Sequence, residues 1–163
     1  MPEQRLWAPW RMEYILGPKS GDCIFCIGAD DGDDAARYVV FRGERCFVML
    51  NAYPYNNGHL MVAPYRHVPS LEDLDERELL EAMTLTQRAL AALRDAYLPD
   101  GFNVGANLGE IAGAGFASHV HLHVVPRWAA DNNFMPVIGD TRVLPQSLRD
   151  SYTALREAFQ RGT

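Results

Sequence analysis

Three histidines alternate with aliphatic residues in the last third of the chain. They are His119, His121 and His123, separated by Val120 and Leu122. In a β-strand this period of two places the imidazoles on one face and the aliphatic side chains on the other. Same-face neighbours on a strand lie about 6.5–7 Å apart. One imidazole can therefore attack a phosphorus or carbonyl centre while a second contacts the leaving oxygen.

A purely structural interpretation of this run is weak. A single histidine on a sheet is usually a core or surface residue. Packing gives no reason to align three titratable rings where Val or Thr would fit better. We therefore interpret the three histidines as a functional site. An imidazole with a pKa near 6.5 is largely neutral at neutral pH, so it offers a ring lone pair to an electrophile.

A glycine-rich loop comes directly before the histidines. Its glycines at 109, 113 and 115 allow backbone N–H groups to approach an anion closely. Many loops of this kind only connect strands. The position of this one favours phosphate binding.

The chain has three cysteines, and an odd number argues against a disulfide framework. Cys23-x-x-Cys26 fits a redox centre, half of a zinc site, or chance. A redox centre needs a βαβ setting and a helix N-terminus, and neither is evident. Half of a zinc site needs two more ligands. Cys46 alternates into a strand and is expected to be an unreactive core residue.

The bulk properties indicate a single soluble domain. At 163 residues, with 48% hydrophobic and 22% charged residues, the chain suits a single core, and no apolar run has the length of a membrane helix. The N-terminus does not resemble a signal peptide, so we expect a cytoplasmic protein without a membrane partner. The formal charge of −6 argues against a nucleic-acid partner.

The pattern of elements predicts an α+β fold. We expect an antiparallel sheet of about five strands, a long helix packed on it that starts at a capping box, Asp75-x-x-Glu78, and a C-terminal helix over 146–161. Residues 29–36 should form a solvated loop. The predicted strands are 38–41, 46–50, 59–63, 102–106 and the histidine strand. The predicted buried stripe of the long helix is Leu79, Met83, Thr86, Leu90, Leu93 and Tyr97.

These blocks resemble the histidine triad (HIT) family. His119-Val-His-Leu-His123 followed by Val124-Val125 is similar to the family signature, in which three histidines alternate with apolar residues. The resemblance extends over about residues 20–127. It includes the segment 51–59, the motif Pro64-x-Arg-His67 and the cysteine pair, which is similar to the entry of zinc-bearing members. The flanks 6–12, 126–128 and 131–134 resemble the bacterial branch that includes diadenosine tetraphosphate phosphorylases.

The resemblance implies a role for each site residue. His121 would attack the α-phosphorus of a nucleotide and form a nucleotidyl-histidine, and His123 would contact the phosphate or the leaving oxygen. Asn107 would bind the phosphoryl oxygens together with backbone N–H groups near Gly115 and Phe116. The remaining assignments are Asn51 on the ribose hydroxyls, Phe47 with Phe25 and Leu50 as walls for the base, and His59 as a hydrogen-bond partner behind the triad.

The resemblance also completes a metal site. Zinc-bearing relatives would use Cys23, Cys26, His67 and His119 as a Cys₂His₂ set. Four protein ligands make a closed, structural zinc site. No organic cofactor is implied.

The expected function is nucleotidyl transfer at the α-phosphate of a dinucleoside polyphosphate, adenine nucleotides favoured, with diadenosine tetraphosphate phosphorolysis as the best match. Hydrolysis of such substrates and adenosine phosphoramidate cleavage remain open. So do a catalytic metalloprotein, which needs a third ligand and an open coordination position, and a regulator with vestigial catalysis. We expect a single HIT domain over 1–163, with an aromatic arm at 5–16 and an extension at 128–163, that assembles as a homodimer or larger homo-oligomer.

Overall fold

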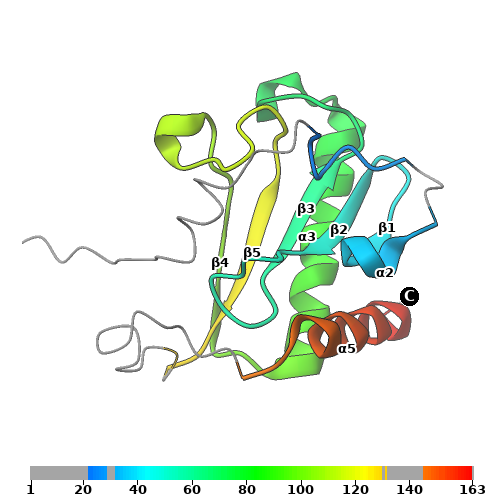
Figure 1. Cartoon of the computed structure of the whole chain (residues 1–163), viewed down its shortest axis with the longest axis vertical. Helices are drawn as coiled ribbons and strands as arrows, with labels where there is room; N and C mark the ends of the chain where they lie inside the picture. Colours follow the sequence, from blue (N-terminus) through cyan, green and yellow to red (C-terminus); the bar gives the residue numbers. More distant parts are fainter. Residues whose placement is uncertain (1–21, 29–31, 130, 132–144, 163) are drawn as a thin grey trace, which may run out of the picture.

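The computed structural model describes residues 22–28, 32–129, 131 and 145–162. The expected aromatic arm at 5–16 and most of residues 130–144 lie outside this part of the chain. Within it, one antiparallel sheet is packed against two helices (Figure 1). No helix in the described ranges is both long and apolar enough to cross a membrane.

The sheet has the five strands that the sequence predicts, so the expected α+β fold class is confirmed. Its order is β1-β2-β3-β5-β4, and every neighbouring pair is antiparallel. The strands are β1 Val39–Arg42, β2 Cys46–Leu50, β3 Leu60–Pro64, β4 Gly101–Gly105 and β5 Leu122–Arg127.

Both faces of the sheet are covered, and successive residues of a strand serve different faces. On β2, Val48 belongs to the core beneath the helices, whereas Phe47 and Met49 belong to a second cluster on the opposite face. This second cluster also contains Phe25 and Ile27. The cysteine-containing segment therefore packs on the sheet face that points away from the helices.

The helix α3, Glu76–Tyr97, begins at the predicted capping box. Asp75 accepts a hydrogen bond from the Glu78 backbone, and the Glu78 side chain accepts one from the Asp75 backbone. The helix α5, Leu148–Arg161, is capped by Ser147 and packs on α3 and β1. The C-terminal helix was expected over 146–161, so this prediction is confirmed.

The predicted buried stripe of α3 is partly wrong. Thr86 and Leu93 are buried as expected, but Leu79 is 39% exposed and Met83 is 54% exposed. Two stripes of this helix have suitable spacing, and the one that contacts the sheet is rich in alanine, which lets the helix approach the strands closely. The buried residues of α3 are Glu78, Ala82, Leu85, Thr86, Ala89, Ala92 and Leu93.

The histidine strand starts later than predicted, because β5 begins at Leu122. The Val120 N–H donates to the Val68 carbonyl at 2.7 Å, so this part of the chain pairs with the loop after β3. His119 and His121 thus precede the sheet ladder instead of lying within it. The expected loop at 29–36 also differs, since Asp34–Arg37 form the short helix α2.

Candidate active site and metal centre

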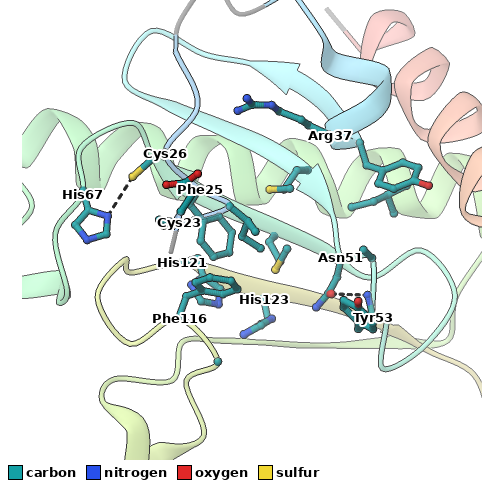
Figure 2. A pocket seen from close by; sticks show the side chains of 18 of the residues that line it. Cys23, Phe25, Cys26, Arg37, Asn51, Tyr53, His67, Phe116, His121 and His123 are labelled. Carbon is teal, nitrogen blue, oxygen red and sulfur yellow. Dashed lines mark hydrogen bonds between the residues drawn. The ribbon is translucent and has the colours of Figure 1, made fainter. Parts of the chain in front are cut away.

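A cavity of about 930 Å³ opens on the sheet face opposite α3. His67, His121 and His123 border it (Figure 2). Its walls come from the cysteine segment, α2, the ends of β2 and β3, the loop after β2, and the loop before β5. A cavity of this size is in the range that binds a nucleotide-sized ligand. The lining residues that matter below are Phe25, Asn51, Gly115, Phe116, His121 and His123.

The backbone fixes the orientation of His121. Its Nδ1 lies 2.9 Å from the carbonyl oxygen of His119. A carbonyl only accepts, so Nδ1 carries the proton and Nε2 carries the lone pair. Burial lowers the pKa of His121, and the hydrogen bond to His119 counteracts part of that shift. The ring is therefore held as a neutral imidazole with a nucleophilic Nε2.

His123 receives the opposite tautomer through a chain of hydrogen bonds. The Tyr55 backbone N–H donates to Nδ1 of the fully buried His59 at 3.1 Å. His59 must then carry its proton on Nε2, which lies 2.9 Å from Nδ1 of His123. His123 accepts at Nδ1, so in its neutral form its proton is on Nε2. Two neighbouring histidines, with ring centroids 4.8 Å apart, thus have different roles available: one lone pair and one N–H.

The loop between β2 and β3 is held by its own polar side chains. Asn51 Oδ1 accepts from the Tyr53 backbone N–H at 2.9 Å, as Figure 2 shows, and Asn51 Nδ2 lies 3.5 Å from Nδ1 of His59. At the other end of the loop, Asn56 Nδ2 donates to the Pro126 carbonyl and to Asp131. The contacts to Tyr53 and His59 therefore hold Asn51 at the cavity wall.

Not every predicted substrate contact borders the cavity. Gly113, Gly115 and Phe116 line it, as expected of the glycine-rich loop. Asn107 does not: its Nδ2 donates to the Gly113 carbonyl at 3.5 Å, so in this geometry it joins the two ends of the loop. Phe47, expected as a wall for the base, is fully buried against Tyr65, with ring centroids 5.3 Å apart, and supports the sheet from within the core.

The four predicted metal ligands come together at one end of the cavity. Ligand atoms of Cys23, Cys26, His67 and His119 all lie within 4.8 Å of one another. The Cys23 and Cys26 Sγ atoms are 3.4 and 3.8 Å from His119 Nδ1, and Cys26 Sγ is 3.1 Å from His67 Nδ1, the contact dashed in Figure 2.

The spacings of 3.1–3.8 Å are close to those around a tetrahedral ion, and the pairs spaced up to 4.8 Å would draw closer on binding. Metal bonds of about 2.0–2.3 Å to nitrogen and sulfur place the four ligand atoms about 3.3–3.8 Å apart. His119 donates from Nε2 to the Pro64 carbonyl at 2.8 Å, so its Nδ1 lone pair faces the cysteines. Cys46 lies outside the cluster, in the core beneath the helices, where burial raises its pKa to about 12.

Two features of the site have no simple signal in the sequence. The Phe25 ring stacks on the His121 imidazole, with centroids 4.4 Å apart and planes at 25°. The Tyr55 ring lies 4.6 Å from that of His59 in addition to the backbone contact. Phe25 was expected only as a wall for the base, and nothing in the Cys23-x-x-Cys26 motif indicates its contact with His121. The stacking depends on long-range packing that local patterns do not report.

Fold and site together define a protein of the histidine triad type. The family model described as "HIT domain" matches residues 34–130, and the chain belongs to the HIT family. The matched segment begins after the cysteine pair and contains all of the sheet.

The relatives and solved structures agree with this assignment. An "AP-4-A phosphorylase" of Mycobacterium tuberculosis is 44% identical over 97% of this chain and 85% of its own length. A hypothetical histidine triad nucleotide-binding protein of Sulfolobus tokodaii has a TM-score of 0.66 at 25% identity, covering 85% of this chain and 93% of its own. A zinc-bound histidine triad protein of Mycobacterium smegmatis has a TM-score of 0.62 at 26% identity, covering 82% of this chain and 96% of its own.

Proposed function

We propose that this chain transfers a nucleotidyl group from a dinucleoside polyphosphate, with diadenosine tetraphosphate as substrate and inorganic phosphate as acceptor. The observation that carries the proposal is the hydrogen bond from His121 Nδ1 to the His119 carbonyl, which leaves the Nε2 lone pair for attack. The similarity to a phosphorylase over nearly the whole chain supports this substrate class. Two further relatives, named as a bis(5'-adenosyl)-triphosphatase and an asymmetrical bis(5'-nucleosyl)-tetraphosphatase, support the hydrolytic alternative.

In the first step, His121 Nε2 bonds to the α-phosphorus and the bond from that phosphorus to the bridging oxygen breaks. The products are a nucleotidyl-His121 and, from diadenosine tetraphosphate, ATP. His123 Nε2–H donates a hydrogen bond to the leaving oxygen, which departs as the ATP anion, and His59 holds His123 in that tautomer.

In the second step, a phosphate oxygen attacks the same phosphorus, the phosphorus–nitrogen bond breaks, and ADP leaves. Water as acceptor would give AMP instead. The backbone N–H groups near Gly115 and Phe116 would stabilise the charged oxygens in both steps, and Asn51 would bind the ribose. Asn107 would have to leave the Gly113 carbonyl to join them.

A brief incubation with diadenosine tetraphosphate, with and without phosphate, tests the proposal by mass spectrometry of products and peptides. We expect ADP and ATP with phosphate present, a nucleotidyl adduct on His121, and loss of turnover by at least about 10³-fold in His121→Ala. AMP and ATP under both conditions would replace the phosphorylase by a hydrolase. An adduct on another residue, or full turnover of His121→Ala, would contradict the mechanism.

We also propose that Cys23, Cys26, His67 and His119 bind one structural zinc ion. The interatomic distances and the His119 tautomer support this set. A bound ion would fasten the cysteine segment to the loop after β3 and to the residue that orients His121. Metal analysis should find one zinc per chain, and Cys26→Ser should lower both the zinc content and the melting temperature. Full zinc content in Cys26→Ser would refute the ligand set.

We further propose one HIT domain that pairs with a second copy of itself through β4. This strand forms one edge of the sheet, and its residues from Asn103 to Gly105 are exposed. Val104 pairs with Val124, which lies beneath α3, so Val104 shares the sheet face that α3 covers. Exposed Leu79 and Met83 on α3 provide apolar surface for the same contact.

A further inference from the structure

We propose that Phe25 is a positioning residue: its ring holds the His121 imidazole in the orientation for attack, and the metal ligands on either side hold Phe25 in place. The inference rests on the proposed function of His121. It assigns the cysteine segment a role in alignment of the nucleophile in addition to its role in binding metal.

The imidazole of His121 is constrained on three sides. One edge is held by the hydrogen bond from Nδ1 to the His119 carbonyl at 2.9 Å. One face is covered by Phe25, at 4.4 Å between centroids with planes at 25°. The His123 ring approaches at 4.8 Å with planes at 74°. A hydrogen bond at one atom permits rocking of the ring, whereas a flat partner on its face opposes rotation out of plane.

Phe25 is itself fixed by its neighbours. Its side chain is fully buried, and Phe116 packs edge-on against it at 5.8 Å. The Cys26 N–H donates to the Cys23 carbonyl at 3.1 Å, which makes a turn with Phe25 inside it. The segment around this turn lies in no helix or strand. The segment is attached to the body of the protein by the buried side chains of Phe25 and Ile27 and by a hydrogen bond from Arg42 to the Gly28 carbonyl. The cysteine thiols, next to His67 and His119, add an attachment on both sides of Phe25.

This placement separates alignment from binding. Phe25 borders the cavity, but its ring is fully buried behind the cavity wall, so its removal should change the affinity for substrate only slightly. The attack on phosphorus, by contrast, depends on the direction of the Nε2 lone pair, and a displacement of about 1 Å can cost about 100-fold in rate. We therefore expect Phe25 to affect the rate of nucleotidyl-histidine formation more than the Michaelis constant.

The chain contains a matched control. Phe47 is also fully buried and belongs to the same hydrophobic cluster, but its aromatic contact is Tyr65 and not a histidine. Phe25→Leu and Phe47→Leu thus remove the same atoms from the same cluster. In single-turnover experiments on the full-length, zinc-loaded protein, Phe25→Leu should form the nucleotidyl-histidine about 10- to 100-fold more slowly, with the Michaelis constant within about threefold. Phe47→Leu, corrected for its folded fraction, should stay within about threefold of the wild-type rate.

A second measurement does not depend on activity. In protein labelled at histidine, the carbon-bound ring protons of His121 should resonate upfield because they lie over the Phe25 ring. Phe25→Leu should abolish this shift and Phe47→Leu should keep it. Zinc removal by a chelator, and Cys26→Ser, should reduce it while the rest of the spectrum stays folded.

Each result decides a separate part of the proposal. An unchanged rate in Phe25→Leu, or equal losses in the two leucine variants, would reduce Phe25 to a core residue. A shift and a rate that survive zinc removal would overturn the role of the metal ligands and leave the stacking intact. If the wild type forms no nucleotidyl-histidine, the proposed function fails, and the ring-proton shift still tests whether Phe25 orients His121.

Discussion

His121 and His123 have identical side chains but differ in which ring nitrogen carries the proton. The difference arises because Nδ1 of each ring has a different hydrogen-bond partner. His121 donates to a carbonyl from Nδ1, so its other nitrogen, Nε2, carries a free lone pair. His123 accepts from His59, so its other nitrogen carries the proton. The partner of His121 is a backbone atom of the triad itself, and the partner of His123 lies 64 residues away in the sequence. The assignment of nucleophile and proton donor therefore follows from the fold.

The first prediction concerns the proton on His123. In His123→Asn, cleavage of an adenosine phosphoramidate with an alkylamine leaving group should slow by about 10²–10⁴-fold, the usual contribution of a general acid. Cleavage of the p-nitrophenyl ester of AMP should slow by less than about 10-fold, because nitrophenolate leaves without a proton. The measurement is single-turnover release of amine or nitrophenolate. Equal losses for the two substrates would show that His123 acts on the phosphate and not on the leaving group.

The candidate site was predictable where residue type and spacing report chemistry. The four metal ligands and the pair His121 and His123 do converge, as the motifs indicate. Of the residues expected as walls for the base, Phe25 and Leu50 line the cavity. Phe47 lies on the same sheet face as the cavity-lining Met49 but packs against Tyr65 in the core, a position that depends on long-range packing. The role of Asn107 in binding the phosphoryl oxygens stays a prediction. Its side-chain amide contacts the Gly113 carbonyl, and the residue does not line the cavity.

At the scale of elements, α3 shows why helix faces are hard to predict. Its sequence offers two stripes with helical spacing, and the stripe with more leucine is the more exposed one. Hydrophobicity alone favours leucine over alanine in the core. Close approach of the helix to β2 and β3 favours alanine instead, and this depends on the shape of the sheet. The strands were easier to predict than the buried face of the helix, because turn residues in the sequence mark both ends of each strand.

The second prediction concerns the first turn of α3. The Glu78 carboxylate accepts hydrogen bonds from Nε and Nη2 of Arg66, both at 2.6 Å. These bonds hold the pKa of Glu78 below its usual range, against the opposing effect of burial. A carboxylate with a lowered pKa stabilises the fold above its unfolded pKa, near 4.3, and this contribution is lost as the pH falls through the folded value. Glu78→Gln should therefore lower the melting temperature by about 3–6 °C at pH 7.

The difference between wild type and Glu78→Gln should shrink below about pH 5 and disappear at lower pH. Thermal unfolding followed by circular dichroism from pH 3 to 8 measures it. Glu76→Gln is the matched control, because Glu76 is an exposed acid in the same helical turn and its removal tests the helix dipole alone. A difference in melting temperature that does not depend on pH would assign the effect to the capping geometry and not to the ion pair.

At the scale of the whole molecule, the two faces of the sheet have separate tasks. The helices α3 and α5 build the core on one face, and the cysteine segment, the cavity and the histidines occupy the other (Figures 1 and 2). The edges differ as well. At the β1 edge α5 packs closely, whereas β4 presents exposed residues at the opposite edge. An association through β4 would leave the cavity face open to nucleotide.

The third prediction tests this association. Light scattering coupled to size exclusion should give twice the chain mass for the wild type. Val104→Lys should weaken the dimer by about 10- to 100-fold, because a lysine on an edge strand opposes pairing with another strand and because Val104 loses apolar contact. Thr153→Lys adds the same charge on α5, which packs against β1 at the far edge of the sheet, and should leave the mass unchanged. A wild type that is monomeric, or a Val104→Lys protein with an unaltered dissociation constant, would exclude β4 as the contact. Nucleotidyl-histidine formation by a monomeric Val104→Lys variant would further show that one chain carries the complete site.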